Sequence, residues 1–80
     1  MKIKMHPVDS STISHIGYCN TRLFVKFKSG TTYRYEGITE EQNRKIMESE
    51  SKMSEVKIAT GGGLFKKLTE EDNDFNRLKY

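Results

Sequence analysis

Apolar and polar residues alternate along residues 23–35, on both sides of a Ser-Gly break, which is the pattern of a β-hairpin. We take residues 28–30 as a three-residue loop, because Gly30 readily adopts the left-handed conformation that such loops require. This loop length sets the register and places Val25 opposite Tyr33. One face of the hairpin is then apolar, and we expect it to join the core; it carries Leu23, Val25, Phe27, Tyr33 and Tyr35.

The opposite face of this predicted hairpin is basic and carries one aromatic ring. We interpret it as a solvent-exposed surface on which Phe24 is the single exposed aromatic residue. This asymmetry between the two faces is the strongest functional indication in the chain. The basic face comprises Arg22, Phe24, Lys26, Thr32, Arg34 and Glu36.

Two more segments favour strands. Residues 1–5 alternate Lys with apolar residues, which predicts an edge strand before Pro7. Residues 13–18 predict another strand, in which the three-residue spacing of Ile13 and Ile16 indicates a β-bulge. With the hairpin, they form a predicted antiparallel meander of three to four strands.

A helix is predicted to begin after Thr39, because Thr39 and Gln42 have the spacing of a capping box. Glu40 and Glu41 suit the positive end of the helix dipole. We expect its apolar stripe to pack on the apolar face of the hairpin, although residues 48–51 are weakly helical and are a candidate break. The stripe consists of Ile46, Met47, Met53 and Val56.

The C-terminal third is less regular. The Thr-Gly-Gly-Gly run at residues 60–63 is predicted to end any element that precedes it. Residues 64–68 predict a short amphipathic turn or helix. Phe75, Leu78 and Tyr80 are expected to anchor the tail. The predicted fold class is therefore α+β, with an antiparallel β-meander, one main helix on one of its faces and a short C-terminal helix.

The composition indicates a single domain over residues 1–80 with a thin core, since hydrophobic residues make up 34% and Trp is absent. Such a core makes a homo-oligomer plausible. The net charge is +3, and the excess of basic residues lies in residues 1–38, which contain six basic and two acidic residues. An anionic partner would be steered to this half of the chain.

The sequence also indicates a compartment. Cys19 is the only cysteine, which excludes an internal disulfide and fits a reducing environment. Neither a signal peptide nor a membrane span is recognisable. We therefore expect a cytoplasmic protein with no membrane partner.

Three groups of residues are specific when taken together: Val8-Asp9-Ser10-Ser11-Thr12-Ile13, Ile16-Gly17-Tyr18, and Leu23, Val25, Phe27, Gly30, Tyr33, Tyr35, Gly37 and Ile38. With these residues the chain resembles the KTSC domain, a family found at the C-terminus of some lysyl-tRNA synthetases and as stand-alone bacterial and phage proteins. The match runs from residue 8 to about residue 51, and residues 60–80 are divergent. The resemblance implies a compact β-meander with a helix, an RNA-binding role, no catalysis and a location in the cytosol of a bacterial or phage-infected cell.

Two features depart from the family pattern. Cys19 stands where the family usually has an acidic residue. The closing Ser-x-Gly-x-aromatic segment of the family can be placed at residues 51–53 without its glycine, or at residues 60–65 after an insertion.

The basic face is the first candidate binding site. Its cations would neutralise phosphates, and Phe24 would stack on a base, as open sheets do with single-stranded nucleic acid. The predicted residues are Arg22, Phe24, Lys26, Lys28 and Arg34. The alternative is an ordinary solvated face, or one covered by the C-terminal tail.

A second candidate is a pocket for a small phosphorylated ligand. Tyrosine hydroxyls at the rim of the helix–sheet boundary would meet the ligand, and the glycine loop would approach its phosphate. Core packing of the tyrosines and a simple linker are the competing interpretations. The pocket would comprise Tyr33, Tyr35, Gly62, Gly63 and Lys66.

Catalysis is not expected. His15 and Cys19 lie four residues apart, but nothing marks the orienting group and oxyanion site that a nucleophile needs. Two histidines and one cysteine also lack the spacing of a structural metal site, so no metal or cofactor is predicted.

We therefore expect a non-catalytic binding protein for a phosphate-bearing ligand, with RNA or another nucleic acid as the leading candidate. The alternative is a phage-encoded inhibitor of bacterial immunity. Such an inhibitor would act as an oligomeric sponge for a nucleotide signal or by binding a host protein.

Overall fold

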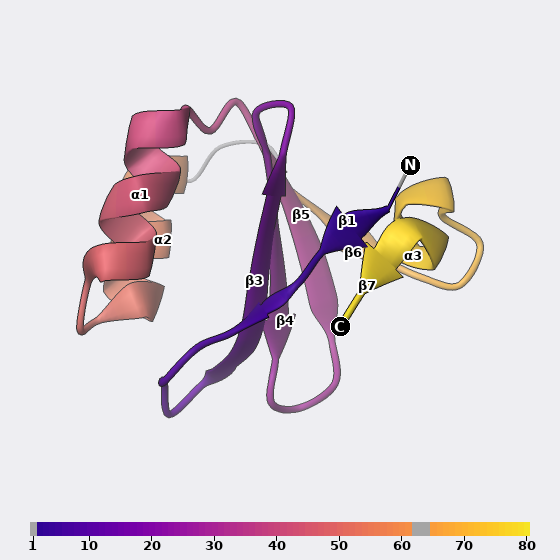
Figure 1. The fold of residues 1–80 in the computed structure, drawn as a ribbon, viewed down its shortest axis with the longest axis horizontal. Coiled ribbons are helices and arrows are strands. Elements are labelled where there is room, and N and C mark those ends of the chain that lie inside the picture. Colours follow the sequence, from indigo (N-terminus) through magenta and orange to yellow (C-terminus); the bar gives the residue numbers. More distant parts are fainter. Residues whose placement is uncertain (1, 62–64) are drawn as a thin grey trace.

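The computed structural model describes residues 2–61 and 65–80. Figure 1 shows its layers, with two helices on one face of a five-stranded sheet and a small strand pair and helix on the other. The sheet is antiparallel, in the order β2-β3-β4-β5-β6, and β1 pairs with β7 in parallel. The elements are β1 (Ile3–Lys4), β2 (His6–Pro7), β3 (Ile13–Cys19), β4 (Arg22–Phe27), β5 (Thr32–Glu36), α1 (Glu40–Glu48), α2 (Lys52–Thr60), β6 (Phe65–Leu68), α3 (Asn73–Arg77) and β7 (Leu78–Lys79).

The central hairpin of β4 and β5 has the predicted register. Val25 pairs with Tyr33 and Leu23 with Tyr35. Gly30 has φ +100°, as the loop requires. The predicted bulge in β3 is also confirmed, because its register against β4 shifts between Ile13 and His15.

The predicted start of the main helix is confirmed, and its end is corrected. The Thr39 hydroxyl accepts from the Gln42 backbone N–H at 3.1 Å, and the Gln42 side chain accepts from the Thr39 N–H at 2.9 Å. The weakly helical segment does break the helix, so there are two helices, α1 and α2, on the apolar face. Lys52 bridges the break by donating to the Met47 and Ser49 carbonyls.

The prediction of a turn or helix over residues 64–68 is wrong for its described part. Residues 65–68 form β6, which pairs with β5 and extends the sheet by one strand. This segment buries Leu68 and leaves the other three side chains exposed, which suits an edge strand better than a helix. The short C-terminal helix is α3 instead.

Each face of the sheet has its own core. The core beneath α1 and α2 contains Ile13, Ile16, Leu23, Val25, Ile38, Ile46 and Val56. The core on the other face, which we call the second core, contains Ile3, Met5, Phe24 and Leu68, with Cys19, Phe75 and Leu78 packed against it.

Gly17 allows the N-terminal segment to cross β3 closely. A Cβ atom at Gly17 would lie 2.6 Å from Met5 Sδ and 2.9 Å from the Lys4 carbonyl oxygen. The Met5 side chain can move aside, but the Lys4 carbonyl oxygen belongs to the backbone and can move only with the chain. Any larger residue would therefore push the N-terminal segment away from the sheet. The strand predicted over residues 1–5 is only β1, which pairs with β7 instead of joining the meander. The edge of the five-stranded sheet is β2, which follows this segment and pairs with β3.

Candidate ligand-binding surfaces

The basic face is closed by the C-terminal segment. Asp74 of α3 has an 8% exposed side chain that accepts from Arg34 at 2.7 Å and Arg77 at 3.1 Å, and Arg22 lies 3.8 Å away. These ion pairs hold α3 over the sheet, beside the Phe24 ring. We call Asp74 and its three arginines the arginine clamp.

The expectation that the basic face is open to solvent is therefore wrong. Phe24 is 1% exposed and cannot offer its ring to a base while the C-terminal segment is in place. Lys26 lies over the Tyr80 ring, at 4.4 Å from its centroid, and Arg22 also pairs with Glu36 at 3.2 Å. Of the predicted cationic residues, Arg22 and Lys28 are exposed, and Lys28 lies in the β4–β5 loop.

Four aromatic side chains form a continuous strip on the helix side of the sheet, toward the β6 edge. The ring centroids are 5.6 Å apart for Phe27 and Tyr33, 5.9 Å for Tyr33 and Phe65, and 6.1 Å for Tyr35 and Phe65. We call Phe27, Tyr33, Tyr35 and Phe65 the aromatic strip. Phe65 is 62% exposed, whereas the other three are half-buried.

The aromatic strip has a cation beside it. Lys67 pairs with Tyr33 across β5 and β6, so both side chains point to the same face of the sheet. Neither Lys67 nor Lys28 forms an ion pair with another residue in the described ranges. Burial, and to a lesser degree the neighbouring Tyr33, raises the pKa of Tyr35, so its phenol stays neutral at physiological pH.

The predicted pocket is only partly assembled. Tyr33 and Tyr35 lie together, but Lys66 points to the opposite face, beside Arg34, and donates to Asp72 at 2.6 Å. Gly62 and Gly63 lie outside the described residues. Tyr35 packs against the core beneath the helices, as the competing interpretation held, whereas Tyr33 contacts the rings of Phe27, Tyr35 and Phe65.

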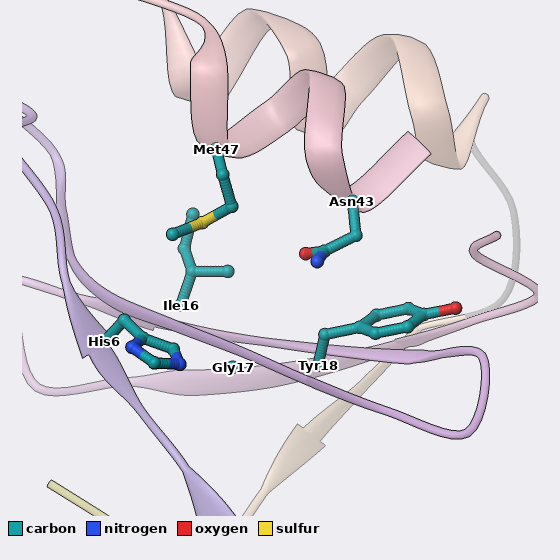
Figure 2. A pocket seen from close by; sticks show the side chains of 6 residues that line it. All are labelled: His6, Ile16, Gly17, Tyr18, Asn43 and Met47. Atoms are coloured by element: carbon teal, nitrogen blue, oxygen red, sulfur yellow. The ribbon is translucent and has the colours of Figure 1, made fainter. Parts of the chain in front are cut away.

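A cavity of about 270 Å³ lies between α1 and the strands β2 and β3. We call it the α1 cavity, and Figure 2 shows its lining of His6, Ile16, Gly17, Tyr18, Asn43 and Met47. The Tyr18 hydroxyl donates to the Ile38 carbonyl at 2.6 Å, which leaves its ring as a wall. Burial and the nearby Glu40 raise the pKa of Tyr18.

The groups considered for catalysis have separate surroundings. The His15 ring packs edge-on against the Tyr80 ring, with their centroids 5.0 Å apart, and its Nδ1 atom is hydrogen-bonded to the Ser14 hydroxyl. Cys19 packs against the second core. Within residues 2–61 and 65–80, no group of three or more His, Cys, Asp or Glu could hold a metal ion.

Sequence reasoning missed both Phe65 and Asn43. Phe65 lies in the segment predicted as a short amphipathic turn or helix, and the order Phe-Lys-Lys-Leu over residues 65–68 has no alternation that would indicate a strand. Asn43 precedes Ile46 and Met47 by three and four residues, so a polar residue in an apolar stripe was the available signal.

The comparisons with known proteins identify the family. The model of the KTSC domain matches residues 9–54, more than half of the chain, and the protein belongs to this family. A crystal structure of a KTSC domain protein from Yersinia pestis is similar, at 32% sequence identity and a TM-score of 0.74, over 84% of this chain and 99% of that one. A search of curated proteins finds no match. None of the described helices is long and apolar enough to cross a membrane.

Proposed function

We propose that the protein is a non-catalytic binding protein for a phosphate-bearing ligand, and that it binds single-stranded RNA through the aromatic strip. The observation that carries this proposal is the exposed Phe65 ring, which contacts Tyr33 and Tyr35 and lies next to Lys67, a residue without an ion pair in the described part of the chain. The proposal retains the ligand class expected from the sequence but moves the binding surface to the other face of the sheet.

The stacking energy suits a short ligand. Unpaired bases stack on aromatic side chains of open sheets, and each stacked base contributes roughly 1–3 kcal/mol. Phe65 offers an accessible ring at the sheet edge, and Tyr33 and Tyr35 extend the platform toward the helices. One or two bases stacked here would provide a modest affinity.

Phosphate contacts would come from Lys67 and Lys28, which flank the aromatic strip along β6 and the β4–β5 loop. Their ammonium groups have no carboxylate partner among the described residues, so no existing ion pair has to be broken for a phosphate to bind. Arg22 and Arg34 differ in this respect, because Asp74 already neutralises them. Each phosphate contact releases a counterion and makes binding weaker as salt rises.

The test is fluorescence anisotropy with a labelled single-stranded RNA and with the same RNA as a duplex. We expect the single strand to bind preferentially, because only unstacked bases can stack on the strip. Phe65→Ala should weaken binding roughly 5- to 150-fold, the loss of one stacked base. Lys67→Ala should reduce the slope of the salt dependence by about one.

Ile58→Ala is the matched control, since Ile58 is a 72% exposed apolar side chain on α2 outside the aromatic strip. Its affinity for RNA should equal that of the wild type. Equal affinities for Phe65→Ala and Ile58→Ala, or no binding of single strands by the wild type, would overturn the proposal. Light scattering on the same samples reports whether a second copy covers the strip instead.

A further inference from the structure

Asn43 occupies a position on α1 where an aliphatic side chain would be expected. It lies one turn before Ile46 and Met47, and Ile46 is completely buried in the core beneath the helices. Figure 2 shows the Asn43 carboxamide projecting from α1 toward the sheet, between Met47 and the Tyr18 ring.

The carboxamide oxygen has no partner in the described residues. Asn43 Oδ1 has less than 1 Å² of exposed surface and accepts no hydrogen bond. A buried acceptor without a donor destabilises the fold, whereas an apolar side chain of similar shape would not. Asn43 lines the α1 cavity, and a turn of its carboxamide about χ2 would bring Oδ1 to a donor on a bound molecule.

The remaining walls of the α1 cavity are suited to a flat molecule. Ile16 and Met47 are apolar, and Tyr18 contributes its ring because its hydroxyl is occupied by the Ile38 carbonyl. His6, which pairs with Ile16 on the edge strand β2, is exposed and adds a second ring. A site with apolar walls and a few polar groups is typical of small-molecule binding.

We propose that the α1 cavity binds a planar nitrogen heterocycle that presents an N–H donor next to a ring-nitrogen acceptor, as adenine does. The side-chain amide of Asn43 matches this edge, because Oδ1 accepts one hydrogen bond and Nδ2 donates another in the same plane. The heterocycle would lie against Tyr18 and Met47, with its open side toward His6. The site shares no residue with the aromatic strip and does not depend on RNA binding there.

Adenosine is the probe, and the readout is the shift of backbone and side-chain amide signals in nuclear magnetic resonance spectra. We expect millimolar adenosine to shift the signals of Gly17, Tyr18 and the Asn43 side chain. Purine riboside lacks the exocyclic amino group and should bind at least about fivefold more weakly, because Oδ1 then stays without a donor. Inosine presents an acceptor in place of that donor and should also bind more weakly.

Asn43→Leu separates the role of the amide from its effect on folding. The variant should fold with a melting temperature at or above that of the wild type, since it removes an unpartnered buried acceptor, and it should lose adenosine binding. Lys45→Leu introduces the same side chain at an exposed position of α1 that does not line the cavity, and it should bind adenosine normally.

Three outcomes would overturn the proposal. These are the absence of shifts at millimolar adenosine, equal affinities for adenosine and purine riboside, and retained binding by Asn43→Leu. Shifts confined to the aromatic strip would equally exclude the α1 cavity, and they would leave the proposal of RNA binding intact.

Discussion

Removing the Asp74 carboxylate should release the C-terminal segment from the sheet. This side chain is 8% exposed and is the common partner of three arginines in the arginine clamp. With the C-terminal segment still in place, Arg34 of Asp74→Ala would be 19% exposed with no anion beside it, so the segment must open for water to reach its guanidinium. The Arg34 Nε atom is already buried without a hydrogen-bond partner, so no hydrogen bond at this atom would offset the loss of the carboxylate.

The size of the effect follows from burial. Breaking a buried ion pair by removing one partner costs about 3–5 kcal/mol, because a buried charge is left uncompensated. The Arg22 and Arg77 side chains are 44% and 33% exposed, so water compensates them in part. We therefore expect Asp74→Ala to lower the free energy of unfolding by about 3 kcal/mol. That is a large share of the roughly 4–12 kcal/mol typical of a chain of this length.

Urea denaturation followed by circular dichroism measures this loss. Glu36→Ala is the matched control, because it removes the carboxylate of an exposed pair with Arg22, at 44% and 39% exposure. Exposed pairs contribute at most about 1 kcal/mol. Hydrogen exchange adds a local readout, since the amides of Met5 and Phe24 should lose protection in Asp74→Ala only.

A result in which Asp74→Ala loses no more stability than Glu36→Ala would refute this reasoning. It would mean that apolar contacts of Phe75 and Leu78 hold the C-terminal segment without the arginine clamp. Phe24 would then stay buried in the variant as well.

Two further predictions concern stability. Gly17→Ala should lower the free energy of unfolding by about 1–3 kcal/mol, measured by urea denaturation, because the new Cβ meets the Lys4 backbone. A negligible loss of stability would contradict the close crossing of the N-terminal segment over β3. The Lys66 side chain and the Thr69 N–H lower the pKa of Asp72 below its usual 3.8, so its stabilising contribution is present above about pH 4 and is lost as pH falls through the folded-state pKa. The melting temperature should consequently fall less between about pH 5 and about pH 3 in Asp72→Asn than in the wild type, and an identical fall would contradict the assignment.

The elements predicted from the sequence are those whose signals are local. The register between β4 and β5 follows from one loop glycine, and the start of α1 follows from two side chains three residues apart. The break between α1 and α2 likewise follows from a short run of weak helix formers. None of these features requires a partner from elsewhere in the chain.

The candidate sites depended on distant contacts. The Tyr33 and Tyr35 side chains were placed on the helix side of the sheet correctly, but their neighbour Phe65 lies thirty residues further on. The face that carries Phe24 has the pattern of a solvated surface, and it is buried only because both ends of the chain cover it.

By itself, the sequence determined the meander, its register, the first helix and the family to which the chain belongs, because hydrogen bonding and side-chain periodicity act within a few residues. Only the tertiary structure decided that both faces of the sheet are covered and that Phe65 stays exposed at its β6 edge. The closure of the basic face rests on the ion pair of Asp74 with Arg34 and on Phe75 and Leu78 packing against the second core. Such long-range burial leaves no periodic pattern in the sequence.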